Sequence, residues 1–579
     1  MGRLRIYLWR YWRRYLLGGI CLFATATLVM WIPWWIREAV RIIEHGGSLR
    51  DVTFYAGVIG LAAIAQGVVR TYSRALIFNA GRDVEYDMRN DLFAHLQKLP
   101  VSFYHARRTG DLMSRVINDI SAVRVMLGPG VLNFVNAPLY YVYALALMLS
   151  MDVRMTLAAL APFPLLIFAA RKFRGRIMKA SMDVQQQMSV LSSHVHENLS
   201  GMHVVKAYSQ EKFQTQQFIA LNEDFQAKSL EMARMRGIVT PIMQGINGLT
   251  VLIVIWYGGI RVVRGDLMVA DIVAFIAYLN VLAWPTAAFG WMLSLVERGR
   301  AAMKRLEEIL NTEPEITSPS APRPVAGLNK GVEFRDVSFA YERQNNGPTA
   351  LEGISFSLPV GRSVGLVGRI GAGKSTVAQL VPRLFDVSSG EILIDGLDIR
   401  KLSLRELRNI LGYVPQDPFL FSTSLRRNLA FGRDAVSDEE LQRAVSIAKL
   451  DRDLEIFPQG LNTVVGERGV TLSGGQKQRA TLARALVMDP PVLILDDCLS
   501  SVDAQTEAEI LQGLRSILKE KTCLIISHRI SAVKEADEIL VLDEGKIIER
   551  GNHEELVERG GVYAELYQQQ RLTEELERI

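Results

Sequence analysis

The first half of the chain carries long apolar runs separated by charged segments. Each run is long enough to cross about 30 Å of hydrocarbon as a helix, because a helix rises about 1.5 Å per residue. The third and fourth runs leave only Met151 to Val153 between them, which predicts a tight hairpin. The pattern predicts six transmembrane helices at 16–36, 53–73, 131–150, 154–170, 238–262 and 270–294.

Two connections between these spans are long and place charged and apolar residues at helical spacing. They run from Asn79 to Arg124 and from Arg171 to Arg236, so we expect the spans to continue as long helical extensions. Basic residues directly follow the second and fourth spans, which favours a cytosolic location for both extensions. Six spans that start in the cytosol also end there, so both termini and all residues after Arg298 are expected in the cytosol.

The first 17 residues are basic and rich in aromatic residues. This composition is typical of a helix that lies on an anionic membrane surface and leads into the first span. A signal peptide is the alternative, but the apolar run ends in WIPWW without a small-residue cleavage pattern. We expect a protein of the cytoplasmic membrane, in contact with the lipid bilayer.

A proline-rich stretch, NTEPEITSPSAPRPVAGLNK, begins at Asn311 and marks a change in pattern. It predicts an extended, solvated linker, with a proline-rich recognition motif as the alternative. After it, short alternating runs such as Val332–Phe334 and Val337–Phe339 open an α/β pattern. The predicted domains are a membrane domain at 1–310, a linker at 311–328 and a second domain at 329–579.

Composition narrows the possible partners. A net charge of +5 on 579 residues gives no reason to expect nucleic acid. Three scattered cysteines are too few for a disulfide framework or a zinc site, and we interpret Cys498 as a packing residue.

Polar residues inside the spans are few, and they either join helices by hydrogen bonds or line a substrate path. No Asp or Glu lies at mid-depth, which argues against a proton relay. Such sparse charge favours apolar or cationic amphiphiles as ligands of the membrane domain. The polar residues are Gln66, Asn133, Asn136, Gln244, Asn247 and Asn280.

The segment GLVGRIGAGKST, Gly365 to Thr376, contains a G-x-x-x-x-G-K-S motif between an apolar strand and the helix-like TVAQLVPRLF. Glycines allow backbone N–H groups to surround phosphate oxygens, Lys374 neutralises the outer phosphates, and Ser375 offers a hydroxyl to Mg²⁺. This is a phosphate-binding loop. The nucleotide-binding residues predicted here are Gly368, Gly371, Gly373, Lys374, Ser375 and Thr376.

A second motif, VLILDDCLSSVD from Val492 to Asp503, predicts a buried strand that ends in two carboxylates. With the phosphate-binding loop in place, Asp496 is expected to be the second protein ligand of magnesium. A third motif, LSGGQ, predicts a helix-capping turn that forms another anion site, at Ser473, Gly474, Gly475 and Gln476. One nucleotide does not need two such sites in one chain, but two facing copies in a dimer do.

These three motifs, in this order, resemble the ATP-binding cassette (ABC) family. With six spans ahead of them, nearly the whole chain resembles a half-transporter of the ABC exporter type. The resemblance implies a membrane α-helical domain fused to an α/β P-loop ATP-binding cassette domain. It also implies ATP and Mg²⁺ as cofactors, a small lipophilic substrate such as a drug, lipid or peptide, and a second half-transporter subunit as partner.

The resemblance assigns further residues one by one. Tyr341 matches the aromatic residue that stacks on adenine, and Gln416 matches the glutamine that reaches Mg²⁺ and the attacking water. Asp503 is similar to the aspartate of the loop that crosses the dimer interface, and His528 to the histidine that contacts the γ-phosphate. Residues 466–469 resemble an exporter-specific loop. Short helices that turn onto the nucleotide domains are implied near 103–111 and before 201–208.

One position departs from the family pattern. The general base after the magnesium ligand is normally Glu, and here it is Asp497. The shorter side chain places the carboxylate about an ångström short of the hydrolytic water, which costs on the order of a hundredfold in rate. Asp497, His528 and Gln416 are the expected catalytic residues, with ATP bound well and hydrolysed slowly.

Such a weak base beside an intact LSGGQ resembles one half of the heterodimeric exporters. We therefore expect a heterodimer in which this chain's signature turn serves the partner's active site. A homodimeric lipid flippase or exporter with two slow sites is the alternative. A membrane sensor ATPase without net transport is a third, and the sequence contains no extra signalling domain to support it.

Overall fold

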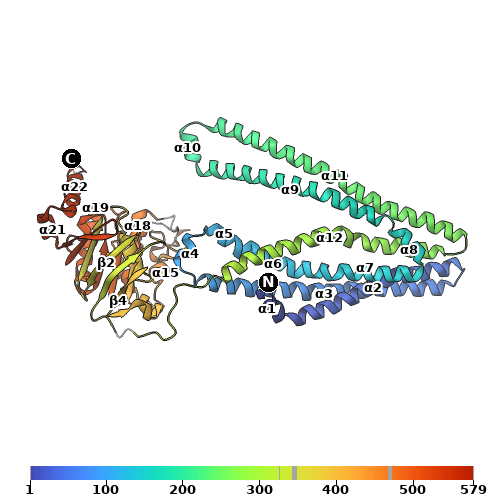
Figure 1. Cartoon of the computed structure of the whole chain (residues 1–579), viewed down its shortest axis with the longest axis horizontal. Helices are drawn as coiled ribbons and strands as arrows, with labels where there is room; N and C mark the ends of the chain where they lie inside the picture. The colour runs from blue at the N-terminus through green and yellow to red at the C-terminus, as the bar shows by residue number, and fades with distance from the viewer. Residues whose placement is uncertain (1, 325–326, 342–348, 434, 467–471, 578–579) are drawn as a thin grey trace. The chain divides into compact units, whose positions relative to one another are not determined.

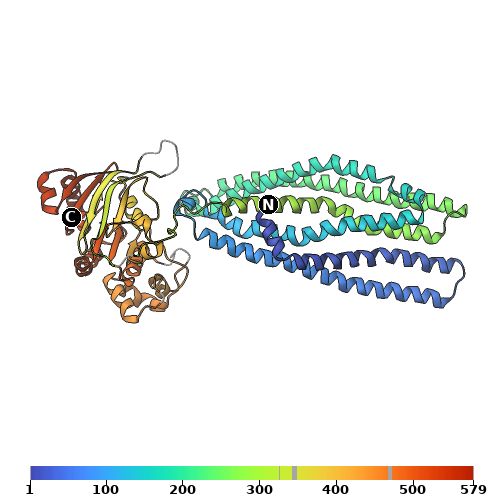
Figure 2. The same ribbon diagram turned by 60° about the horizontal axis from the view of Figure 1, so that its bottom comes forward.

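The computed structural model describes residues 2–324, 327–341, 349–433, 435–466 and 472–577 (Figures 1 and 2). The chain divides into two compact units. The first unit holds Met1–His95 and Gly110–Asn311. The second holds Leu96–Thr109 and Thr312–Ile579.

The first unit is helical. Figure 1 shows α9 and α11 as a long antiparallel pair that α10 joins at one end. Two π-helical turns, η1 (Arg115–Asp119) and η2 (Met126–Gly130), interrupt the stretch before α7. The α-helices are α1 (Gly2–Arg10), α2 (Trp12–Glu44), α3 (Leu49–Leu96), α5 (Thr109–Ser114), α6 (Ile120–Val125), α7 (Val131–Met151), α8 (Val153–Leu160), α9 (Phe163–Ser200), α10 (Met202–Ala207), α11 (Glu211–Val263) and α12 (Val269–Leu310).

Within the described residues, five helical stretches are long and apolar enough to cross a membrane: α2, α3, Thr109–Met151, α11 and α12. They contain the first, second, third, fifth and sixth predicted spans. The fourth prediction, a single helix over 154–170, was wrong in its continuity, since α8 ends at Leu160 and α9 begins at Phe163. Pro162 and Pro164 cause the break, because proline cannot donate the N–H that a continuous helix needs.

The predicted hairpin and the helical extensions are confirmed. Asp152 lies between α7 and α8 and caps α8 by accepting a hydrogen bond from the N–H of Met155 at 2.6 Å. The extensions continue α3 to Leu96 and α9 to Ser200. The N-terminal helix α1 is fixed to α3, where the Tyr7 hydroxyl donates to Asp91 at 2.7 Å.

The second unit is an α/β domain. Its two sheets have the strand orders β2-β1-β4-β5 and β10-β9-β3-β8-β7-β6. The strands are β1 (Val332–Phe339), β2 (Leu351–Leu358), β3 (Ser363–Gly368), β4 (Ser389–Ile394), β5 (Leu397–Asp398), β6 (Leu411–Val414), β7 (Val492–Asp496), β8 (Thr522–Ile526), β9 (Glu538–Asp543) and β10 (Lys546–Gly551). The helices are α4 (Val101–His105), α13 (Lys374–Leu380), α14 (Leu404–Asn409), α15 (Leu425–Leu429), α16 (Asp438–Ile447), α17 (Asp451–Ile456), α18 (Gly474–Val487), α19 (Ala504–Glu520), α20 (Ile530–Val533), α21 (His553–Arg559) and α22 (Val562–Glu577), with the 3₁₀ turns η3 (Ile399–Lys401) and η4 (Gly460–Asn462).

The larger sheet positions the predicted site. Strands β6, β7, β8, β3 and β9 are parallel, and β10 pairs antiparallel at the edge. The phosphate-binding loop follows β3, Gln416 follows β6, Asp497 follows β7, and His528 follows β8. All of these positions lie at the carboxyl ends of parallel strands, which is where such sheets bind ligands.

Two local boundaries differ from the sequence pattern. The runs Val332–Phe334 and Val337–Phe339 form one strand, β1, whose pairing shifts at the left-handed Asp336 (φ 49°). The helix after the phosphate-binding loop was predicted to reach Phe385, but α13 ends at Leu380, just ahead of Pro382.

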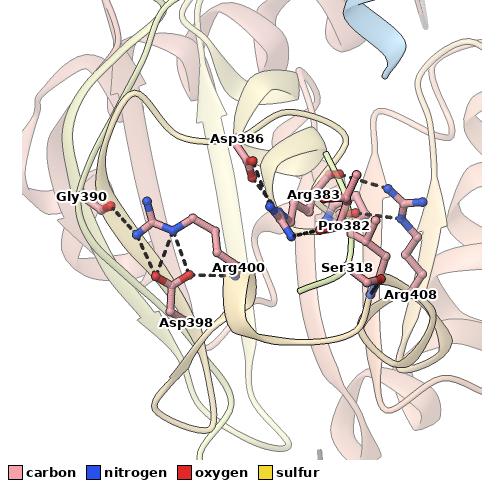
Figure 3. Close-up of polar contacts among 10 residues, drawn as sticks. Ser318, Pro382, Arg383, Asp386, Gly390, Asp398, Arg400 and Arg408 are labelled. Atoms are coloured by element: carbon pink, nitrogen blue, oxygen red, sulfur yellow. Dashed lines mark hydrogen bonds and ion pairs between the residues drawn. The ribbon is translucent and has the colours of Figure 1, made fainter. Parts of the chain in front are cut away.

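The linker is extended and mostly exposed, and it also hydrogen-bonds to the α/β unit. The carbonyl of Thr317 accepts a hydrogen bond from Arg383 at 3.1 Å, and Ser318 Oγ accepts one from the N–H of Leu404 at 3.1 Å. Figure 3 shows the cluster: Arg383 is paired with Asp386, and Arg408 reaches the carbonyl of Pro382. The linker therefore follows the surface of the α/β unit as a hydrogen-bonded strap.

Candidate nucleotide site

The phosphate-binding loop has the backbone that its glycines predict. Gly373 has φ 97°, and a Cβ there would lie 2.5 Å from the carbonyl oxygen of Ala350, so only glycine fits. Gly368 and Gly371 also have positive φ. The loop turns directly into α13, whose first residue is Lys374. Its backbone N–H groups are therefore placed as a phosphate cradle at a helix N-terminus.

Lys374 is buried and points back into the loop. Its Nζ donates to the carbonyl oxygens of Gly368 and Arg369, both at 2.8 Å. An ammonium has three donors, so one remains for a phosphate oxygen. Burial lowers the pKa of Lys374 to about 8, and the nearby Asp497 and Asp496 oppose this shift. The lysine is thus still mostly charged at neutral pH, but it loses its proton more readily than an exposed lysine.

Ser375 and Asp496 lie together as the magnesium prediction requires. Ser375 Oγ donates to Asp496 Oδ1 at 2.9 Å, and Asp496 is the buried last residue of β7. Burial raises the pKa of Asp496 to about 6, while the Ser375 hydrogen bond opposes this rise. A hydroxyl and a carboxylate are the hard oxygen ligands that Mg²⁺ prefers, with phosphate and water completing its shell. The residues present therefore fit this ion.

Asp497 contacts residues of two other predicted motifs. Its carboxylate accepts hydrogen bonds from Gln416 Nε2 and from the backbone N–H of His528, both at 3.4 Å. The residue is buried and has a left-handed backbone with φ 45°, which its own N–H stabilises by donating to Ile526 at 2.8 Å. The predicted catalytic residues are thus brought together in one place.

Gln570, which the sequence analysis missed, holds the histidine segment. Its amide donates to the carbonyl of His528 at 2.5 Å and accepts from the N–H of Ile530 at 2.8 Å. Burial and the charge of Lys374 lower the pKa of His528, and Asp497 opposes this. Gln570 ends a plain run of three glutamines, so no motif could have identified it.

Tyr341 lies beside the loop in an aromatic cluster. Its hydroxyl hydrogen-bonds to Thr376 Oγ1 at 3.0 Å, and its ring contacts Phe385 edge-on at 5.4 Å. Phe385 in turn lies 6.1 Å from the ring of His105 in α4. A line of rings therefore joins this short helix to the predicted adenine-stacking residue.

The LSGGQ turn is the N-terminus of α18, as predicted. Ser473 Oγ accepts from the N–H of Gln476 at 3.2 Å, and the Gln476 side chain accepts from the N–H of Ser473 at 2.9 Å. Gly475 packs on the chain at Ser501, where a Cβ would lie 2.9 Å from the carbonyl oxygen. In the described part of the chain, no hydrogen bond joins this turn to the phosphate-binding loop.

The other predicted positions are partly described. Asp503 caps α19 by accepting from the N–H of Thr506 at 2.9 Å, and this bond lowers the pKa of Asp503. Gly474 is exposed at the start of α18. Of the exporter-specific loop, residues 467–469 lie outside the described residues. Short helices are present at α4 and at α10, the second lying within 201–208 rather than before it.

A phosphate-binding loop, a magnesium-competent strand end and a capped glycine turn, on a chain with long apolar helices, define a membrane-bound ATP-binding protein. Families described as "ABC transporter transmembrane region" and "ABC transporter" match residues 15–286 and 351–500. A probable multidrug resistance ABC transporter ATP-binding/permease protein of Bacillus subtilis, YheI, is 35% identical over 97% of this chain and 96% of its own length.

Two further relatives extend this comparison. The ATP-dependent lipid A-core flippase of Desulfotalea psychrophila is 32% identical over 90% of this chain and 91% of its own. The structure of a bacterial Atm1-family ABC exporter with ATP bound is 28% identical, with a TM-score of 0.79 over 96% of this chain and 98% of that one. The chain belongs to the ABC transporter family, and it is a multi-pass exporter-type protein with an ATPase domain.

Proposed function

We propose that this chain is the slow half of a heterodimeric ABC exporter that moves lipophilic or amphipathic substrates out of the cytosol at the cost of ATP. The single observation that carries the proposal is Asp497 at the position of the general base. Its carboxylate lies against Gln416 and His528, so it is in place but short. ATP that binds this chain's loop therefore stays bound for a long time before it is hydrolysed.

The geometry supports the following residue roles. Lys374 and the loop N–H groups bind the phosphates, Ser375 and Asp496 hold the magnesium ion, and Tyr341 stacks on adenine. When bound, that ion neutralises charge on the phosphates. Gln416 and His528 orient the water and the γ-phosphate around Asp497. The intact turn at Ser473–Gln476 and the exposed Asp503 serve the nucleotide held by the partner subunit, across the dimer interface.

Transport requires the two chain halves to be coupled. We assign the membrane domain to 1–310, the linker to 311–328 and the nucleotide domain to 329–579, with both termini in the cytosol. In the α/β unit, Val101 of α4 packs against the buried cluster under the sheets, and Phe103 is itself buried. ATP-driven closure of two nucleotide domains would therefore move α4 and, with it, the helices that continue into the membrane.

Two measurements on the co-purified two-chain complex test the proposal. D497N should leave ATP turnover nearly unchanged, whereas a Glu→Gln change at the partner's general base should abolish it. Loss of turnover in D497N, or a homodimer with brisk activity, contradicts the heterodimer. Flux of fluorescent amphiphiles into inverted vesicles tests export: no ATP-dependent flux for any of them would favour the sensor ATPase.

A further inference from the structure

The helical unit contains a cavity of about 360 Å³ between α2, α3, α7 and α12. Its walls differ in chemistry. The residues from α2 and α12 are apolar apart from Thr25, whereas every lining residue from α3 is polar. A cavity of this size suits a headgroup with the first part of a chain. Besides Thr25, the polar lining comprises Gln66, Arg70, Ser73, Arg74, Asn133, Asn136 and Tyr140.

Arg70 and Arg74 lie one helical turn apart on α3, so two like charges occupy the same wall and repel each other. Among the described residues, neither guanidinium forms a hydrogen bond or an ion pair. Other arginines of this unit are paired: Arg37 with Asp271 at 2.5 Å, Arg261 with Asp152 at 2.9 Å, and Arg305 with Asp119 at 2.5 Å. The cavity arginines thus have unused donors where a bound anion would offset their repulsion.

Asn136 adds a second sign of a ligand in this cavity. Its Oδ1 is buried and has no hydrogen-bond partner among the described residues. An unpartnered buried acceptor is costly, and the Nδ2 of the same amide also forms no hydrogen bond among the described residues. Asn133 differs, because its Nδ2 donates to the carbonyl of Pro129 at 2.8 Å. The Asn136 amide is therefore free to donate to a ligand.

We infer that this cavity binds the anionic headgroup of an amphiphile, with Arg70, Arg74 and Asn136 on the headgroup and the α2 and α12 wall along its chain. Arginine suits this role, since its planar fork matches the oxygens of carboxylate and phosphate. The inferred ligand differs from the apolar or cationic amphiphiles that the sequence analysis favoured. That expectation did not consider Arg70, which lies inside the predicted span 53–73, or Arg74, which follows it by one residue.

That the bound amphiphile is the exported substrate rests on the proposed function. That the cavity binds it does not. The test uses the full chain in phosphatidylcholine nanodiscs without nucleotide. Dodecyl phosphate is the probe, dodecyltrimethylammonium carries the same chain with the opposite charge, and inorganic phosphate is the headgroup alone. R82Q is the matched control, because Arg82 lies on the same helix about 12 Å from Arg74 and outside the cavity.

Dodecyl phosphate should bind R70Q/R74Q about a hundredfold more weakly than wild type, and R74Q about tenfold more weakly. R82Q should bind as wild type, and the cationic probe should not weaken in any variant. Equal affinity of wild type and R70Q/R74Q for dodecyl phosphate overturns the inference, as does equal weakening in R82Q. If thermal unfolding shows that the double variant does not fold, the affinity of R74Q decides between these outcomes.

Competition with a bilayer lipid identifies the source of the anion. Competition by phosphatidylglycerol in the nanodisc supports a bilayer lipid in the site, and binding that this lipid does not reduce supports a soluble amphiphile. Both outcomes keep the anion site. ATP-dependent flux is measured separately: a wild-type complex that exports nothing but binds dodecyl phosphate through Arg70 and Arg74 refutes the proposed function and leaves the site standing.

Discussion

The phosphate-binding loop and the LSGGQ turn of this chain differ in what they retain. At the loop, Lys374 hydrogen-bonds to the loop carbonyls and Ser375 to Asp496, but the proposed general base beside them is the short Asp497. The turn is complete, with a reciprocal capping box that fixes its helix. In the proposed dimer, the loop and the turn of one chain contact different nucleotides. A substitution in one of them would therefore leave the other able to function.

The substitution expected to lower ATP turnover most is one in the LSGGQ turn. Gly474 is exposed, and a Cβ there would lie 3.5 Å from Ser501, in ordinary contact. G474D should therefore fold and place a carboxylate where the partner's γ-phosphate binds, lowering ATP turnover of the two-chain complex about a hundredfold. Steady-state ATPase activity measures this, with G474A as the neutral control. Near-normal turnover in G474D would mean that the turn does not serve the working site.

A smaller effect is expected from pH on the ATP affinity of the phosphate-binding loop. The pKa of Lys374 is about 8 before ATP binds, and phosphate binding requires the charged ammonium. ATP affinity should thus fall by about fivefold as pH rises from 8 to 9, and binding near pH 8 should take up about half a proton. Calorimetry in buffers of different ionisation enthalpy measures the uptake. No uptake at this pH, or the same uptake in K374R, would show that Lys374 is already charged.

The smallest effect concerns the support of the histidine segment. Q570A removes the two hydrogen bonds that hold His528 and Ile530, and it should lower stability by about 1 kcal/mol and slow turnover a few-fold. Denaturant unfolding and ATPase activity report both quantities. Q569A, an exposed neighbour, is the control. Equal stability and turnover of the two variants would show that Gln570 does not support the histidine segment.

The sequence predicted those functional residues that belong to one contiguous motif. The loop, the strand ending at Asp496 and the cap at Ser473 are local, so residue type and spacing identify them. The support by Gln570 and the Arg70–Arg74 cavity arise only when distant segments pack together. The break at Pro162 was readable but was outweighed by the apolar run around it.

We propose that one missing methylene at Asp497 makes this site slow, and ATP hydrolysis by the purified chain in nanodiscs tests this directly. D497E restores the reach of the general base toward the hydrolytic water. We expect wild type and D497N to hydrolyse ATP at similarly low rates, and D497E to be at least about tenfold faster. A brisk wild type that D497N abolishes and D497E does not accelerate would contradict it.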